Sequence, residues 1–220
     1  MSFINDWIEW LPGLLSGLLV SLQVTFWASI LGFPLGLLLA LLSISRHPMV
    51  RWPTILFVEI FRGIPLLVII YLVYFGLPDA GLTMGALVAV VVAMTVNLGA
   101  YSSEIFRAGI LSVSKGQTEA SLSLGLTRTH ELVYIVLPQA LRAVPGPLMS
   151  QLILVFQATS LGFAVGLSEL LNRAYEIGSL NFSYLSVLVL AGTIYAAISI
   201  VTSRAVAAIE NAQNGSRVRT

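Results

Sequence analysis

The chain has 220 residues, of which 57% are hydrophobic and only 10% are charged, and its formal net charge is +1. Because soluble domains carry about 25% charged residues, this composition excludes an ordinary soluble protein and predicts a membrane protein. The absence of cysteine excludes a disulfide framework, a thiol nucleophile and a cysteine-based metal site. His47 and His130, the two histidines, stand far apart in the sequence, so we expect no metal site.

Lys115 is the only lysine of the chain, and it stands between Ser114 and Gly116. A Walker A loop needs a Gly-Lys-Ser or Gly-Lys-Thr step to hold phosphate, which this lysine does not provide. The chain is therefore not a P-loop ATPase, and we expect it to be neither an enzyme nor the holder of a cofactor. Any ATP that its function requires must be hydrolysed by a partner.

Five apolar segments reach the roughly 20 residues that a transmembrane helix needs. They predict an all-α integral membrane protein with a single transmembrane domain over residues 1–220 and spans at about 14–42, 52–75, 82–106, 138–167 and 184–208. The first segment is longer than a bilayer requires, so its helix should tilt or project. Small-xxx-small spacings among its glycines let another helix pack closely against it; these glycines are Gly13, Gly17, Gly32 and Gly36.

The second segment contains the tetrapeptide Glu-Ile-Phe-Arg, which recurs 45 positions later in the third. Glutamate and arginine three positions apart lie on one helix face, and either would be costly alone in a membrane. We therefore expect Glu59 with Arg62, and Glu104 with Arg107, to form structural charge pairs within or across the two helices. In the alternative interpretation, Arg107 serves only as a positive anchor on the cytoplasmic side.

Two of the segments contain helix breaks, because a proline removes a backbone hydrogen bond and kinks a helix. Pro65 follows Gly63 in the second segment, and Pro145-Gly146-Pro147 interrupts the fourth. A polar, broken segment at membrane depth must line a cavity or face protein. We predict that the kink at Pro65 and the polar face of the fourth segment line a substrate path at a subunit interface, with the side chains of Gln151, Gln157, Thr159 and Ser160. In the alternative interpretation, Thr159 and Ser160 only satisfy backbone carbonyls in a bent helix.

The longest stretch that a bilayer would not accept runs from Lys115 to Arg142. Gly125 follows a helix-like run over residues 117–124, at the place where a residue in the left-handed conformation ends a helix. Pro138 opens the next hydrophobic segment, as proline does in a first helical turn. We thus predict a helix, a glycine break, a second short helix and a return to the membrane. A further short helix is expected within residues 168–183.

Lysine and arginine are divided unequally between the two sides of the predicted spans. Nine of the eleven lie in the loops after the first, third and fifth segments, whereas Arg173 alone lies on the opposite side and Arg62 lies within a segment. Because cytoplasmic loops carry the excess of positive charge, we expect the N-terminus outside and the C-terminus in the cytoplasm. The polar loop from Lys115 is then cytoplasmic as well.

A motif with fixed spacing lies in this polar loop: Glu119-Ala120-Ser121, then Gly125, then Ile135-Val136-Leu137-Pro138. It resembles the EAA signature of bacterial ABC importer permeases, with Ser121 where that family has alanine. The likeness covers almost the whole chain and is closest to the polar amino acid permeases. It implies a type I ABC importer permease fold in the bacterial cytoplasmic (inner) membrane, with residues 115–137 as a coupling loop docked on an ATPase. The residues that the resemblance places at the ATPase are Glu119, Ala120, Ser121, Gly125, Leu126 and Pro138.

The same resemblance implies the partners of such a permease. Two cytoplasmic ATPase subunits would hold ATP and magnesium, and a second permease, identical or related, would complete the pore. An extracytoplasmic binding protein would deliver a polar amino acid, which would cross by alternating access. The chain would otherwise contact membrane lipid, and no nucleic acid is expected as a partner.

The substrate is indicated by the run from Phe156 to Leu161, FQATSL, which resembles the FQDTSL run of the polar amino acid permeases. Ala158 stands where the family usually has aspartate, so this chain lacks a carboxylate that could pair with a substrate ammonium. The flanking residues lean towards glutamate, aspartate or glutamine. The alternative function is a self-sufficient secondary transporter or channel subunit, since broken helices and the intramembrane Glu59 and Arg62 are typical of ion paths. Co-purification with an ATPase separates the two functions.

Overall fold

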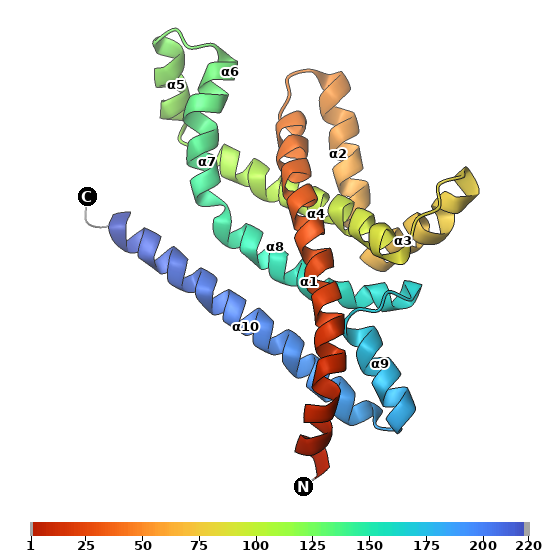
Figure 1. Ribbon diagram of the computed structural model, residues 1–220. Helices are drawn as coiled ribbons and strands as arrows, with labels where there is room; N and C mark the ends of the chain where they lie inside the picture. The colour runs from red at the N-terminus through yellow and green to blue at the C-terminus, as the bar shows by residue number, and fades with distance from the viewer. Residues whose placement is uncertain (1, 218–220) are drawn as a thin grey trace.

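The computed structural model describes the backbone of residues 2–217 and the side chains of residues 6–207. In that part of the chain every regular element is a helix, and short turns connect the helices (Figure 1). Short 3₁₀ and π segments, labelled η, lie between the α-helices. In chain order the elements are α1 (Ser2–Ser43), α2 (Pro48–Gly63), α3 (Leu66–Tyr71), η1 (Leu72–Gly76), η2 (Leu77–Ala80), α4 (Ala86–Leu111), α5 (Lys115–Ser123), α6 (Arg128–His130), η3 (Glu131–Val136), α7 (Leu137–Ala143), α8 (Pro145–Ala158), η4 (Thr159–Val165), α9 (Leu170–Asn181) and α10 (Tyr184–Arg217).

Among the described residues, four helical stretches are long and apolar enough to cross a membrane, and there are five if one bent pair counts as a single span. The bent pair is Pro48–Gly63 with Leu66–Ala80, which meet at an angle of 104°. The kink predicted at Pro65 is therefore confirmed, and it is far sharper than the bend of one continuous helix. The four unbroken stretches are Asp6–Ser43, Ala86–Leu111, Pro145–Val165 and Tyr184–Ala207.

The longest contact in the fold runs along α1 and α4, which cross near the centre of Figure 1. A Cβ atom at Gly32 would lie 2.9 Å from a methyl carbon of Leu98, and one at Gly36 would collide with the hydroxyl of Ser102. The close packing predicted from the glycine spacing of the first segment is confirmed at these two positions. Around this contact a buried apolar core gathers residues of α1, α3, α4, α8 and η4, including Val24, Ala28, Ile70, Met94, Leu98 and Val155.

The N-terminal half of α1 packs against α9 and α10 in a second buried core that includes Leu14, Leu170, Ala174 and Val187. This core lies at the end of the molecule that carries the N-terminus and α9 in Figure 1. The loop between α1 and α2 lies at the opposite end, together with the hairpin of α5 and α6. The fold therefore separates the polar loop from α9 by the length of the helical bundle.

The apolar helix of the fourth segment begins at Pro145, whereas the sequence places the start of this span at about residue 138. The chain is continuously helical through α6, η3 and α7, so Pro138 does not open a new helix. A π segment directly precedes it, and a π turn widens the helix where a proline removes a backbone hydrogen bond. The break comes at Val144, which lies between the end of α7 and the start of α8 at Pro145.

Candidate functional site

The polar loop is a helical hairpin whose turn is fixed by backbone hydrogen bonds. Gly125 has a φ of 82°, so its predicted left-handed conformation is confirmed. Its N–H donates to the carbonyl of Leu122 at 3.0 Å, and the N–H of Leu126 donates to the carbonyl of Ser121 at 3.2 Å. These two bonds form a Schellman motif, which satisfies carbonyls that the end of a helix leaves without donors. The turn after α5 is therefore a defined structure rather than a loose loop.

The second arm of this hairpin begins at Thr127, whose hydroxyl oxygen accepts from the backbone N–H of His130 at 3.4 Å. This arm continues without interruption into α7. Leu126 directly precedes the arm, and Pro138 lies within it. A groove of about 700 Å³ separates the hairpin from the ends of α1 and α4; its charged lining residues are Arg46, Lys115, Glu119, Arg128 and Glu131.

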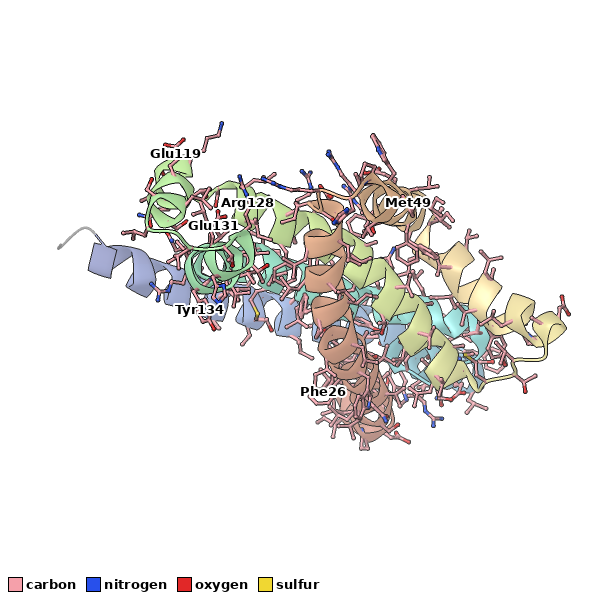
Figure 2. All side chains as sticks on the ribbon, turned by 90° about the horizontal axis from the view of Figure 1, so that it is seen from above. Phe26, Met49, Glu119, Arg128, Glu131 and Tyr134 are labelled. Carbon is pink, nitrogen blue, oxygen red and sulfur yellow. The ribbon has the colours of Figure 1, made fainter. Side chains whose placement is uncertain are left out.

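The outer surface of the hairpin is available to a partner. Glu119 and Ala120 are exposed, whereas Ser121 is buried and donates to the carbonyl of Thr118 at 2.8 Å. Leu124 and Tyr134 add large apolar groups that are 83% and 69% exposed. Figure 2 shows Glu119 at the edge of the molecule, pointing away from the bundle. Glu119 and Tyr134 lie on opposite sides of the hairpin in Figure 2, so the hairpin offers a partner charged and apolar contacts on different faces.

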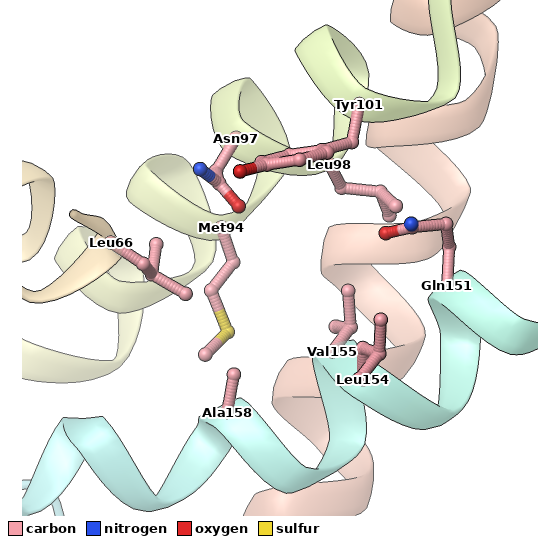
Figure 3. A pocket seen from close by; sticks show the side chains of 9 residues that line it. All are labelled: Leu66, Met94, Asn97, Leu98, Tyr101, Gln151, Leu154, Val155 and Ala158. Carbon is pink, nitrogen blue, oxygen red and sulfur yellow. The ribbon is translucent and has the colours of Figure 1, made fainter. Parts of the chain in front are cut away.

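A second candidate site is a cavity of about 240 Å³ between α3, α4 and α8 (Figure 3). Its polar groups are Asn97 and Tyr101 from α4 and Gln151 from α8, and none of them is charged. Leu66 lines it from α3, next to the proline break. The remaining lining residues are Met94, Leu98, Leu154, Val155 and Ala158. An uncharged cavity with a few convergent polar groups is the usual form of a small-molecule site.

The same α4 side chains hold the break between α2 and α3. Pro65 has no N–H, so the carbonyl of Phe61 has no backbone donor four residues ahead. Asn97 Nδ2 donates to this carbonyl at 3.1 Å, and Tyr101 Oη donates to the carbonyl of Arg62 at 3.0 Å. Positions 97 and 101 are four apart and therefore share one face of α4. The bend and the cavity wall are thus built from the same two residues.

The structure brings only part of the predicted substrate path to this cavity. Gln151 lines it, but Gln157 Nε2 donates instead to Ser199 Oγ on α10 at 3.1 Å. The hydroxyl of Thr159, which is fully buried, donates to the carbonyl of Phe156 at 2.7 Å, and that of Ser160 donates to the carbonyl of Gln157 at 2.9 Å. The two hydroxyl groups do satisfy backbone carbonyls, as the alternative interpretation expects, but whether they also line the path stays a prediction.

Helical periodicity explains why these four polar residues separate. The cavity face of α8 carries residues 151, 154, 155 and 158, a spacing of three, four and seven that follows one side of a helix. Positions 157, 159 and 160 fall on other sides. Pro65 itself does not line the cavity, although Leu66 does. A partner subunit facing Gln157 or Ser160 stays a prediction, whereas their place on one polar face with Gln151 was wrong.

The two Glu-Ile-Phe-Arg segments form pairs within their own helices. Arg107 Nε lies 3.1 Å from both carboxylate oxygens of Glu104, and its Nη2 also donates to that carboxylate. Arg62 reaches Glu59 by one contact of 3.4 Å, and its guanidinium lies 5.6 Å from the centre of the Tyr101 ring. Identical tetrapeptides therefore give a bidentate pair on α4 and a loose pair on α2.

Glu169 is a buried residue to which the sequence pattern gave no role. Its carboxylate accepts from the backbone N–H groups of Leu171 and Asn172, each at 2.8 Å, and from the hydroxyl of Tyr195 at 2.9 Å. It thereby caps α9 and ties it to α10. Next to this carboxylate, the hydroxyl oxygen of Ser21 on α1 accepts from the backbone N–H of Leu170 at 3.3 Å. Burial raises the pKa of the Glu169 carboxyl above its ordinary value, against the opposing effect of these hydrogen bonds.

The sequence carried one signal for Glu169: it precedes a predicted short helix, where a carboxylate can cap free N–H groups. Asn97 and Tyr101 were missed because only the fold brings them to the break. Because Pro65 lacks an N–H, the carbonyl of Phe61 nevertheless needed a hydrogen-bond donor from another part of the chain.

Comparison with known proteins gives concordant matches. Residues 32–214 match the family described as binding-protein-dependent transport system inner membrane component. The arginine transport system permease protein of Bacillus subtilis (strain 168) is 35% identical over 86% of this chain and 86% of its own length. The glutamate/aspartate import permease protein of Escherichia coli O157:H7 is 35% identical over 90% of this chain and 93% of its own. A crystal structure of an amino acid ABC transporter with histidines superposes with a TM-score of 0.90 at 31% identity, over 96% of this chain and 98% of that one.

Proposed function

The chain belongs to the family of binding-protein-dependent transport system inner membrane components, and we propose that it is the permease subunit through which an ATP-driven importer moves a polar amino acid by alternating access. The observation that carries the proposal is the joint presence of an exposed, rigid hairpin with the EAA spacing and an uncharged polar cavity between the apolar helices. The first can receive mechanical work from a partner, and the second can pass a zwitterion.

The hairpin of α5 and α6 is the surface on which we place the ATPase. Glu119 and Ala120 are exposed there, and the Gly125 turn fixes the angle between its two arms. Two ATPase subunits would bind ATP and magnesium and hydrolyse the nucleotide, since this chain carries no Walker A loop. The groove between the hairpin and the ends of α1 and α4 leaves room for the hairpin to move when the ATPase pair closes.

The cavity between α3, α4 and α8 is the place where we expect the amino acid to pass. Asn97, Tyr101 and Gln151 offer donors and acceptors without a charge, which suits a zwitterion that must also leave. Ala158 lies on the cavity wall, so no carboxylate is present there to pair with a basic side chain. An uncharged wall favours the amide side chain of glutamine over that of arginine. The preference for glutamate or aspartate rests on the sequence flanking Ala158 alone, and relatives named for glutamate/aspartate and for arginine are equally similar at 35% identity.

The partners follow from the same reasoning. A second permease, identical or related, would face this one across the pore, and an extracytoplasmic binding protein would deliver the amino acid. We place the N-terminus and α9 outside and the hairpin in the cytoplasm of a bacterial cell, because positive side chains gather around the hairpin end: Arg46 between α1 and α2, Arg51 in α2, Lys115 in α5 and Arg128 in α6.

Uptake into membrane vesicles tests this function. Vesicles that contain the chain, its ATPase and its binding protein should take up labelled glutamine, glutamate or aspartate only when ATP is present. Uptake without the ATPase would instead support a secondary transporter, and uptake of arginine alone would contradict the substrate class.

Substitution of Gly125 tests the hairpin separately. A side chain in the left-handed conformation costs about 1 kcal/mol or more, although nothing lies within 4 Å of Gly125 to obstruct it. We expect Gly125→Ala to weaken ATP-dependent uptake strongly while the chain still reaches the membrane. Gly116→Ala is the matched control, because Gly116 does not have a positive φ and should tolerate the methyl group. Equal uptake by the two variants would remove the turn from the coupling mechanism.

A further inference from the structure

The carbonyl oxygens of Phe61 and Arg62 depend on side chains that also form the wall of the cavity. Backbone hydrogen bonds of α2 end with the N–H of Ile64, which donates to Ile60, and those of α3 begin at the carbonyl of Pro65. Between these two bonds, Asn97 and Tyr101 supply the donors that the proline break removes. A ligand that takes hydrogen bonds from the cavity wall therefore competes with the backbone of the bend.

The two donors differ in how many hydrogen bonds they can give. An asparagine amide has two N–H groups, so Asn97 can hold the carbonyl of Phe61 and still donate to a ligand. A tyrosine hydroxyl has a single proton, so Tyr101 must choose between the carbonyl of Arg62 and a ligand. A carboxylate is the stronger acceptor, because a hydrogen bond to an ionised group is roughly twice as strong as one between neutral groups.

We propose that Tyr101 is a switch that releases the α2–α3 bend when the carboxylate of an amino acid enters the cavity, while Asn97 keeps the bend attached. This inference rests on the proposed function, in which the cavity receives an amino acid. Release is possible because Tyr101 also lines the cavity, so a ligand bound there can compete with the carbonyl of Arg62 for its hydroxyl proton. Occupancy of the cavity thus changes the number of tethers on α2 from two to one.

A movement of α2 can affect the hairpin through the N-terminal end of α2, which lies away from the bend. A groove of about 430 Å³ lies between α2, the end of α1 and the C-terminal part of α4, with Arg51, Ile55, Leu111 and others in its lining. Leu111 also lines the larger groove beside the hairpin, and the chain passes from it to α5 within four residues. A swing of α2 about the bend therefore alters the support of the segment that leads to the ATPase.

The test compares ATP hydrolysis with and without amino acid in vesicles that hold the complete transporter. Tyr101→Phe removes the hydroxyl but keeps the ring beside Arg62, so the bend should be held permanently by Asn97 alone, as in the occupied state. We expect hydrolysis without amino acid to rise about two- to tenfold, the factor that one net hydrogen bond represents, and the further stimulation by amino acid to shrink. Tyr175→Phe on α9 is the matched control, since the Tyr175 ring is 48% exposed and far along the chain from the bend.

Asn97→Leu separates the two roles, because loss of the fixed attachment should lower the thermal stability of the purified chain more than Tyr101→Phe does. The inference is overturned if Tyr101→Phe keeps the wild-type ratio of stimulated to unstimulated hydrolysis, or lowers both rates in parallel, as a merely structural hydroxyl would. It is also overturned if Tyr175→Phe changes the ratio equally. A wild-type complex that hydrolyses ATP but transports no amino acid would refute the proposed function instead, while the effect of Tyr101→Phe on unstimulated hydrolysis would still be measured.

Discussion

Glu169 and the pair Asn97 and Tyr101 satisfy helix ends in opposite ways. An isolated helix leaves N–H groups free at its start and carbonyls free at its end. At the start of α9, one fully buried carboxylate accepts from two backbone N–H groups and a hydroxyl. At the end of α2, two partly exposed side chains donate to two carbonyls beside a cavity.

This contrast in burial indicates which of the two regions can move. Around Glu169, water has no access, so breaking any of its bonds leaves a buried polar group unpaired at about 1–3 kcal/mol. At the α2–α3 bend, both donors line a cavity, so the polar groups of a ligand can compete for them. We therefore regard the junction of α1, α9 and α10 as the rigid part of the subunit and the bend as its mobile part. The following substitutions rank the two by size of effect.

Glu169→Ala should have the largest effect. It removes the acceptor of Leu171, Asn172 and Tyr195 at once, and all three bonds involve a side chain with no exposed surface. We expect the yield of folded protein in the membrane to fall to a small fraction of wild type. Glu169→Gln keeps one acceptor oxygen and should give an intermediate yield. A wild-type yield of Glu169→Ala would mean that this junction is not the rigid part.

The pH dependence of stability gives a second, smaller effect at the same site. Burial raises the pKa of Glu169, so between its ordinary and its raised value the folded chain holds a proton that the unfolded chain has released. The contribution of Glu169 to stability is therefore greatest at low pH and falls as the pH rises through this window.

Thermal unfolding of the detergent-purified chain measures this difference. The stability of the wild type relative to Glu169→Gln, which cannot titrate, should decrease as the pH rises from the ordinary carboxyl range. All other carboxylates are common to the two proteins and cancel. A difference that grows with pH would show that the carboxylate form, rather than the protonated form, is favoured by the fold.

Prediction from the sequence succeeded where the signal was local. Gly125 was placed correctly because only a glycine readily takes the left-handed conformation that ends a helix, and Pro65 was placed because a proline always lacks its N–H. The membrane fold followed from apolar length alone. Asn97 and Tyr101 could not be assigned their partners, because hydrogen bonds between segments 36 and 39 positions apart depend on how the helices pack. The N-cap contacts of Glu169 are local, but its bond to Tyr195, 26 positions away, depends on packing as well.

The polar residues of the fourth segment show a different limit. Their composition correctly indicated contact with protein rather than lipid, since Gln157 bonds to Ser199 and Thr159 is buried. Treating them as one face was wrong because the helical period separates position 151 from positions 157, 159 and 160. Ala158, a residue without polar atoms in its side chain, shares the cavity face with Gln151 instead.

A double substitution at the bend tests whether Asn97 replaces the N–H that Pro65 lacks. Asn97→Leu leaves the carbonyl of Phe61 without its donor and should destabilise the chain by about 1 kcal/mol. In a Pro65→Ala background the helix can continue once Ile64 turns from its extended ψ of 130° to the helical range, and the restored N–H then bonds this carbonyl, so the same substitution should cost less. Pro53→Ala is the control background, because Pro53 lies in α2 away from the bend and its effect should add to that of Asn97→Leu. Additive effects in both backgrounds would refute the replacement.

The smallest expected effect on thermal stability concerns the two Glu-Ile-Phe-Arg segments. It gives a lower limit against which the effects at Glu169 and at the bend can be judged. Their sequences are identical, but Glu104 makes a bidentate pair and is 28% exposed, whereas Glu59 makes one contact of 3.4 Å and is 63% exposed. Exposed ion pairs contribute about 0–1 kcal/mol, and the bidentate geometry belongs to the upper part of that range. Glu104→Gln should therefore lower the thermal unfolding temperature by a small but measurable amount, while Glu59→Gln should leave it unchanged. Equal effects would show that position in the membrane, rather than geometry, decides the strength of these pairs. A loss as large as that of Glu169→Gln would place this part of α4 among the rigid parts and remove the contrast with the bend.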